Sequence, residues 1–108
     1  MQTTGRPLVL FVTMDACYYC DKMVNETYAN RGVCSDLMEN FVPAIAHSDD
    51  HPNFIRKLGI ETFPTTLIIG ADSKVMDSIT GFVSAKKFRR HLQAARTQAA
   101  AARQISQR

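Results

Sequence analysis

Apolar positions in this chain follow two periods that alternate along the sequence. Short runs that are apolar or β-branched at successive positions are typical of strands buried in a sheet. Three segments have this pattern and predict strands: Leu8–Thr13, Phe41–His47 and Thr66–Ile69. Val75–Thr80, which follows a predicted hairpin turn, is the fourth. Between them, apolar residues recur every three or four positions, as on one face of a helix. Strands that alternate with helices favour an α/β fold built around one sheet.

The first half of the chain predicts two helices. The first begins at Cys17 or Tyr18, Asn30 and Gly32 end it, and a short helix over residues 35–39 follows. The inward face of the first helix has the spacing i, i+3, i+4 and i+8: Cys20, Met23, Val24 and Tyr28.

Cap and turn residues bound the elements of the second half. Pro52 near a first helical position and Gly59 after the last apolar position delimit a short helix, and Gly70–Ser73 forms a hairpin turn. Ser84 caps a last helix. The inward positions of this helix are Phe88, Leu92 and Ala95. Residues 97–108 are rich in Ala, Gln and Arg, and either extend the helix or fray.

Composition narrows the class of protein. With 108 residues and 45% hydrophobic content, we expect a single domain over residues 1–108 with its core at about 7–96. The net charge of +3 is too weak and too local to indicate a nucleic-acid partner. The chain has no apolar run of about 18 residues, so we expect no membrane span, and we expect a monomer.

The start of the chain bears on the expected compartment. Met1–Arg6 and the short apolar run Leu8–Val12 lack the length and the small-residue cleavage site of a signal peptide. We therefore expect a cytoplasmic protein, or a periplasmic one if an export signal has been removed from a longer precursor.

A basic cluster lies on the last predicted helix. It consists of Lys86, Lys87, Arg89, Arg90 and Arg96. We interpret this charge run as the solvated face of the helix. The other interpretation is a docking patch for a partner.

Two cysteines, Cys17 and Cys20, stand where the first predicted strand gives way to the first helix. Residues three apart on a helix are neighbours, so the two sulfurs can close a disulfide. The unpaired N–H groups and the dipole at a helix start favour a thiolate at Cys17. A C-x-x-C motif in this setting predicts redox chemistry.

Two other interpretations of the cysteines stay open at this point. The pair can be structural, or it can be half of a zinc site completed by other candidate ligands: Cys34, His47 and His51. A structural zinc site usually shows a second tight pair of ligands, which the sequence lacks. We expect no metal and no cofactor, and we expect Cys34 to be a small buried hydrophobe rather than a regulatory thiol.

The order of these features resembles the thioredoxin superfamily. A strand, C-x-x-C, a helix, a strand and a helix precede Phe63-Pro64-Thr65, a hairpin and a final helix. Cys17, Cys20, Pro64 and Gly81 occupy the family's relative positions over about residues 7–95. Other short segments are similar to small bacterial thioredoxin-like proteins: Phe41-Val42-Pro43, Gly59-Ile60 and Gly81-Phe82.

The resemblance implies a thioredoxin-like fold with a central mixed four-stranded sheet flanked by helices. The N-terminal strand and helix of thioredoxin are expected to be missing, which leaves the second predicted strand at the sheet edge. Pro43 agrees with an edge position because it cannot donate to a ladder. The resemblance also implies a cis bond before Pro64, against the disulfide, with the Phe63 backbone pairing with an extended substrate.

By the same resemblance, the protein is a thiol-disulfide oxidoreductase. Cys17 attacks a protein or peptide disulfide, Cys20 resolves the mixed disulfide, and a separate redox partner restores the pair. Tyr18 and Tyr19, with Phe63, are expected to form an apolar rim that favours protein substrates. A non-catalytic binding or chaperone module is the alternative.

Departures from the family pattern bear on the electrostatics. Phe11 stands where thioredoxin has a buried aspartate, so the proton of Cys20 must go to water or to another group. The carboxylates considered for this role are Asp15, Asp21 and Glu61. No histidine separates the cysteines, and nearby aspartates disfavour a second negative charge, so we expect a reducing or intermediate couple.

Overall fold

The computed structural model describes residues 5–106, and the side chains of residues 5–102. Its elements follow one another in this order: β1 (Leu8–Thr13), α1 (Tyr18–Lys22), η1 (Met23–Tyr28), α2 (Arg31–Asn40), β2 (Val42–His47), α3 (Pro52–Lys57), β3 (Thr65–Ile69), β4 (Val75–Thr80) and α4 (Ala85–Ser106).

The strands form one mixed four-stranded sheet, as predicted, and their order is β2-β1-β3-β4. β1 pairs with β2 in parallel, and the other two pairs are antiparallel. β2 lies at an edge, so the prediction from Pro43 is confirmed. The N–H of Val42 donates to Pro7 in front of β1, so the next nitrogen, that of Pro43, faces the free edge where no ladder bond is lost.

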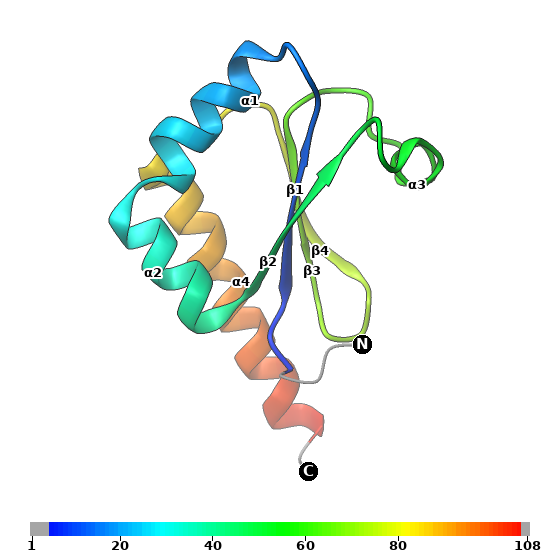
Figure 1. Ribbon diagram of the computed structural model, residues 1–108. Helices are drawn as coiled ribbons and strands as arrows, with labels where there is room; N and C mark the ends of the chain where they lie inside the picture. The colour runs from blue at the N-terminus through cyan, green and yellow to red at the C-terminus, as the bar shows by residue number, and fades with distance from the viewer. Residues whose placement is uncertain (1–4, 107–108) are drawn as a thin grey trace.

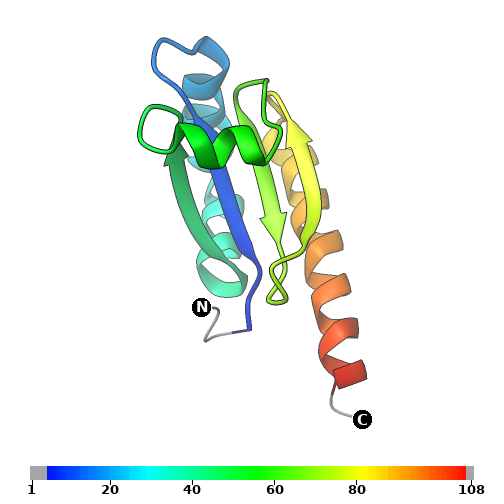
Figure 2. The same cartoon turned by 90° about the vertical axis from the view of Figure 1, so that its right-hand side faces the viewer.

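Helices cover the two faces of the sheet unequally. α1, η1, α2 and α4 lie on one face, and the short α3 is the only helix of residues 5–106 on the other (Figures 1 and 2). β1 is buried on both sides, as its unbroken apolar run predicted: Val9 and Phe11 join one buried cluster, and Leu10 and Val12 join the other.

The last helix follows its prediction closely. Phe88, Leu92 and Ala95 are buried against the sheet, and the Ser84 hydroxyl caps the helix by accepting from the N–H of Lys87. The tail continues as helix to Ser106, so extension was the correct alternative for the part of the tail that the structure describes. Among the described residues, no helix is long and apolar enough to cross a bilayer.

The boundary between the first two helices was predicted wrongly. Asn30 does not end the first helix but caps α2, where its side-chain oxygen accepts from the N–H of Val33 at 3.1 Å. Gly32 therefore lies inside α2, which runs to Asn40. Asn, Ser and Asp are all good N-cap residues, so the sequence alone did not decide which one starts the helix. The burial of Val33 and Leu37 against the sheet decides that Asn30 is the residue that starts the helix.

The inward face of the first helix also differs from the prediction. Val24 is 45% exposed, and Thr27 is buried in its place. The chain from Met23 to Tyr28 is a π-helix, in which the N–H of Ala29 donates to the Val24 carbonyl five residues earlier. The wider turn moves the inward position from Val24 to Thr27, whose hydroxyl donates to the Val83 carbonyl and is thereby satisfied.

Candidate active site

Strand register brings four separate segments to one end of the sheet. Thr13 pairs with His47 in the parallel ladder, so the residues that follow β1 and β2 meet there. β3 begins and β4 ends at the same place, because Thr65 pairs with both Val12 and Thr80. We call this region the disulfide end: residues 14–22, 48–51, 59–64 and 81–84. Figure 1 shows it at the top of the molecule.

Cys17 and Cys20 form a disulfide at this end, with 5.2 Å between their Cα atoms. Cys17 is the N-cap of α1, and its sulfur accepts from the N–H of Cys20 at 3.2 Å. Cys17 is half-buried, whereas Cys20 is 1% exposed. The helix start thus provides an N–H donor and a positive dipole at the more accessible sulfur, which favours the thiolate of Cys17 after reduction.

The turn into Cys17 is held in a conformation that is unusual for a side chain larger than glycine. Ala16 has a φ of 52°, in the left-handed region. The segment after it is closed by the hydrogen bond from the Asp21 N–H to the Cys17 carbonyl. This turn redirects the chain from the end of the buried strand into α1 and brings Cys17 to the helix start.

Pro64 lies at the disulfide end. The Phe63–Pro64 bond is cis, as the resemblance implied. Since Thr65 pairs with Val12, Pro64 comes beside the end of β1, from which the chain turns toward Cys17. Pro64 is buried, its carbonyl accepts from the N–H of Gly81 at 2.7 Å, and half-buried Phe63 packs against both core clusters.

Two aromatic side chains follow Cys17 directly, and a third lies at the same end of the sheet. Tyr18 is 72% exposed and Tyr19 is 54% exposed, and their rings meet edge to face with centroids 5.0 Å apart. Lys22, in the last turn of α1, holds its ammonium 4.6 Å from the centre of the Phe82 ring. Exposed aromatic groups of this kind are suited to contact with a protein surface.

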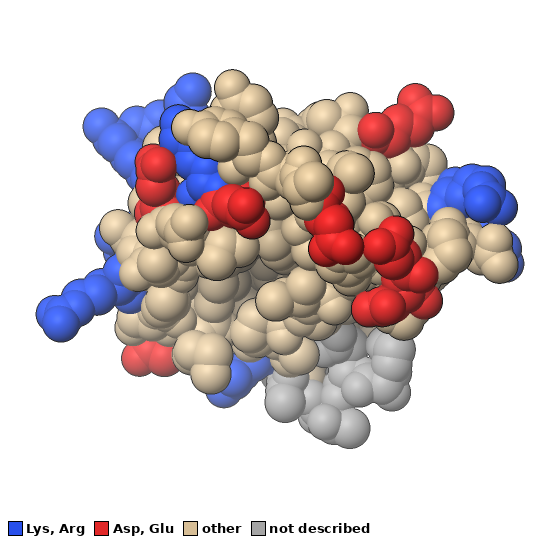
Figure 3. Space-filling model, turned by 45° about the horizontal axis from the view of Figure 1, so that its top comes forward, with Lys and Arg blue, Asp and Glu red and all other residues tan. Residues whose placement is uncertain are grey.

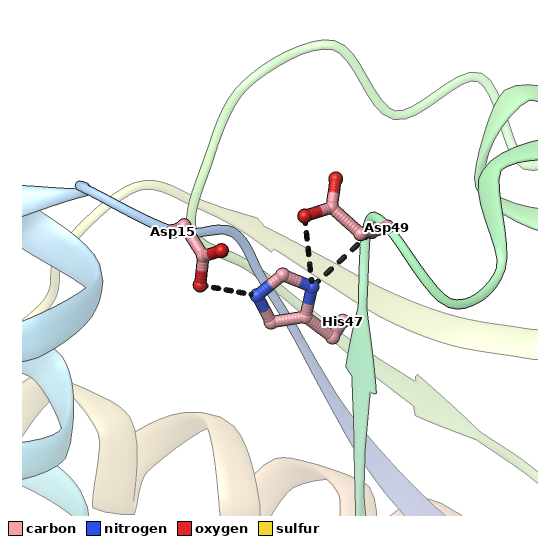
Figure 4. A group of neighbouring side chains, drawn as sticks. All are labelled: Asp15, His47 and Asp49. Carbon is pink, nitrogen blue, oxygen red and sulfur yellow. Dashed lines mark hydrogen bonds and ion pairs between the residues drawn. The ribbon is translucent and has the colours of Figure 1, made fainter.

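A histidine from β2 clamps the loop that leads to Cys17 (Figure 4). The Nε2 of His47 lies 2.8 Å from an oxygen of Asp15, and its Nδ1 accepts from the backbone N–H of Asp49 at 3.2 Å. Because Nδ1 is an acceptor, the neutral ring carries its hydrogen on Nε2 and donates it to Asp15. The hydrogen bond with Asp15 is the main cause that raises the pKa of His47, with further help from the charges of Asp15, Asp49 and Asp50.

The same three side chains form the one group of possible metal ligands found among the described residues: Asp15, His47 and Asp49. The two carboxylates face different nitrogens of the ring, Asp15 at Nε2 and Asp49 at Nδ1. This arrangement is suited to a hydrogen-bonded clamp. The zinc ligands considered from the sequence are not brought together, because this group contains neither Cys34 nor His51.

A buried hydroxyl pair lies between the π-helix and β3. The Tyr28 hydroxyl and Thr66 Oγ1 are 2.8 Å apart, and the Tyr28 ring meets Phe11 edge to face. Burial raises the pKa of Tyr28 well above its usual range, and the hydrogen bond with Thr66 acts in the opposite direction. Tyr28 therefore stays neutral and serves as a packing and hydrogen-bonding group.

The carboxylates considered as proton acceptors for Cys20 lie on the surface. Asp15, Asp21 and Glu61 are exposed, whereas Cys20 belongs to the same buried cluster as Phe11. Asp15 is occupied by His47. The geometry therefore does not single out any of the three for this role.

The prediction that Cys34 is buried is wrong. Its thiol is exposed and donates to the Tyr28 carbonyl at 2.8 Å. Because α2 begins at Arg31, four residues earlier than predicted, Val33 rather than Cys34 faces the core.

A family model described as a thioredoxin-like domain matches residues 1–96. The chain belongs to this thioredoxin-like family. The solution structure of a thioredoxin from Thermus thermophilus aligns with a TM-score of 0.83 at 20% identity, covering 94% of this chain and 82% of that one. The predicted thioredoxin-like fold is confirmed.

Two other structures show the same fold. The C-terminal domain of Neisseria meningitidis DsbD in the oxidised form aligns with a TM-score of 0.70 at 24% identity, covering 83% of this chain and 80% of that one. The DsbH oxidoreductase aligns with a TM-score of 0.75 at 14% identity, covering 86% of this chain and 74% of that one. A comparison with curated protein sequences finds no match.

Proposed function

We propose that this thioredoxin-like protein is an enzyme, a thiol-disulfide oxidoreductase that exchanges disulfides with protein substrates through Cys17 and Cys20. The observation that carries the proposal is the placement of the disulfide. One sulfur is accessible at the start of a helix, the other is buried one turn behind it, and the two residues between them carry exposed aromatic rings. This asymmetry suits a nucleophile paired with a resolving thiol.

In the reducing direction, the Cys17 thiolate attacks one sulfur of a substrate disulfide. A bond forms between Cys17 and that sulfur, and the other substrate sulfur leaves as a thiolate that takes a proton from water. The Cys20 thiol loses its proton to water and attacks the Cys17 sulfur. This second step releases the remaining substrate thiolate and forms the Cys17–Cys20 disulfide, so two electrons have passed to the substrate. A dithiol redox partner then reduces the pair by the reverse exchange.

The cycle requires a fold that accommodates both oxidation states of the pair. The DsbD C-terminal domain, which shares this fold, has been determined in the oxidised and the reduced form, and both align with similar TM-scores of 0.70 and 0.71. The likeness supports the proposal that this chain also cycles between the two states.

We place the couple among reductants or intermediate couples. No cationic side chain separates the cysteines, and Asp15 and Asp21 lie close to them in the chain, so the Cys17 thiolate gains little beyond the helix start. Equilibration of the pair with a glutathione buffer gives the potential directly. Known couples run from about −270 mV to about −120 mV, and a value near −120 mV would contradict this assignment.

Substrate contact is proposed for Tyr18, Tyr19, Phe63 and Pro64. The tyrosine rings offer exposed apolar area next to Cys17, and the segment before β3 reaches the same end of the sheet. An extended substrate segment beside Phe63 would gain backbone hydrogen bonds, as in strand addition.

Insulin reduction with dithiothreitol as the electron source tests the proposal. Wild-type protein is expected to accelerate the reduction, Cys17→Ser to lose the effect, and Cys34→Ser to keep it, because Cys34 lies outside the disulfide end. Equal activity of wild type and Cys17→Ser would favour a non-catalytic binding module.

The measured potential also bears on the compartment, for which we propose the cytoplasm, or the periplasm if an export signal precedes this sequence.

A further inference from the structure

The disulfide end carries an unbalanced negative charge. Its carboxylates are all exposed: Asp15, Asp21, Asp49, Asp50 and Glu61. Lys22 is the single lysine or arginine in these segments, and its ammonium stacks on Phe82. The whole chain, by contrast, has a formal net charge of +3. The sign of the charge at the disulfide end is therefore opposite to that of the protein as a whole.

Topology explains why these carboxylates gather. They come from three separate segments of the chain, which all meet at the end of the sheet defined by the pairings of Thr13 with His47 and of Val12 with Thr65. Figure 3, in which this end comes forward, shows acidic side chains spread over the face and most basic side chains toward its margins.

Few of these charges are neutralised within the protein. His47 pairs with Asp15 at 2.8 Å and lies 4.0 Å from an oxygen of Asp49. No ion pair involves Asp21, Asp50 or Glu61 among the side chains of residues 5–102. These three carboxylates are available to a partner that approaches Cys17.

We propose that the disulfides this protein exchanges are those flanked by lysine or arginine, so that its substrates are basic proteins or peptides. The inference rests on the proposed function and adds the substrate class. Carboxylates around a reacting group raise the local concentration of cationic partners and repel anionic ones. The exposed tyrosines contact the apolar part of the substrate, and the surrounding carboxylates select its charge.

The test uses three peptides that contain one disulfide each and differ only at the flanking positions, which hold Lys, Gln or Glu. At low ionic strength we expect kcat/KM for the Lys peptide to exceed that for the Glu peptide about tenfold or more, with the Gln peptide between them. In about 0.5 M NaCl the preference should shrink to about twofold or less, because salt screens exposed charges.

A pair of charge-matched variants locates the source of the preference. Asp50→Asn/Glu61→Gln removes two negative charges from the disulfide end and should reduce the preference at least about threefold. Glu39→Gln/Asp72→Asn removes two charges at the opposite end of the sheet, where β2 starts and the β3–β4 hairpin turns, and should leave it unchanged. Asp72→Asn keeps the side-chain oxygen that accepts from the Lys74 N–H.

The outcomes separate the substrate class from the activity. Equal kcat/KM for the three peptides at low salt, or a preference for the Glu peptide, would overturn the charge selection while the oxidoreductase activity stands. A preference that is unchanged in Asp50→Asn/Glu61→Gln would overturn it as well. Failure to reduce any of the peptides would overturn the proposed function and this inference together.

Discussion

The disulfide end and the groove between α2 and α4 differ in charge, shape and chemistry. The groove has a volume of about 990 Å³. It is lined by the N-cap Asn30 and by residues of the two helices: Gly32, Ser35, Asp36, Glu39 and Asn40 of α2, and Ala85, Lys86, Arg89, Arg90, Gln93 and Arg96 of α4. It is rich in cations, whereas the disulfide end is acidic. Neither cysteine of the disulfide lines this groove. A site that reacts with another protein's disulfide needs an accessible sulfur more than it needs a deep pocket.

Two of the basic side chains make contacts with α2 inside the groove. The Arg89 guanidinium lies across Gly32, where a Cβ atom would come within 2.6 Å of it, and Arg96 pairs with Asp36 at 3.4 Å. Lys86, Arg89 and Arg90 have no acidic partner among the described side chains. The basic cluster predicted from the sequence is exposed, which confirms the solvated face. Its use as a docking patch stays a prediction.

The largest expected difference between the two regions is in activity. Cys17→Ser should lower insulin reduction by at least about 10³-fold, because the nucleophile is lost. Arg89→Gln/Arg90→Gln, in the groove, should leave the rate within about twofold, since neither residue reaches the disulfide end. The rates are compared at equal protein concentration. A comparable loss in the groove variant would show that the cations take part in turnover.

The buried polar contact should contribute more to the free energy of unfolding than the exposed one. Tyr28→Phe leaves the buried Thr66 hydroxyl without its partner and should lower the free energy of unfolding by about 1–2 kcal/mol. Arg96→Gln removes an ion pair at the partly exposed surface of the groove and should cost at most about 0.5 kcal/mol. Urea denaturation of both variants measures the difference. Equal losses would contradict the assignment of the hydroxyl pair as the stronger contact.

The aromatic rim should affect large substrates more than small ones. Tyr18→Ala/Tyr19→Ala removes exposed apolar area next to Cys17 and should raise KM for a protein disulfide about five- to tenfold. The rate with a small aromatic disulfide reagent should change less than about twofold, because such a reagent needs only the sulfur. Equal effects on both substrates would mean that the tyrosines act on Cys17 itself and not on the bound protein.

The smallest expected effect is the pH dependence of the His47 clamp. The folded protein raises the pKa of His47, chiefly through the hydrogen bond with Asp15, so protonated His47 contributes stability. This contribution is fully present below the usual histidine pKa of about 6.5 and is lost as pH rises through the raised value. The stability gap between wild type and His47→Gln should therefore be larger at pH 5.5 than at pH 8.5.

His51→Gln is the matched control for this clamp, because its side chain makes no ion pair among the described residues. The stability of His51→Gln relative to wild type should change less between the two pH values than that of His47→Gln. Parallel behaviour of the two variants would show that the hydrogen bond between His47 and Asp15 does not stabilise the protein in solution.

Local patterns in the sequence were sufficient for the framework of this fold. Apolar or β-branched runs and the hairpin turn predicted β1 and β4 to the residue and placed the other strands within one residue. The spacing of Phe88, Leu92 and Ala95 predicted the inner face of α4. These features are encoded within a few neighbouring residues, since side-chain periodicity depends only on the local backbone. The C-x-x-C motif likewise predicted the disulfide between Cys17 and Cys20.

Features that depend on contacts between distant segments were missed. From the sequence alone, His47 is a possible zinc ligand, but its partner Asp15 is 32 residues away and is brought near only by the pairing of β1 with β2. The burial of Thr27 instead of Val24 follows from the π-helix, and the exposure of Cys34 follows from the start of α2 at Arg31. A sequence pattern specifies which face of an element is apolar, but the packing of the elements against one another decides which residues meet. In this protein, that packing brings the five carboxylates to the end of the sheet that holds the cysteines.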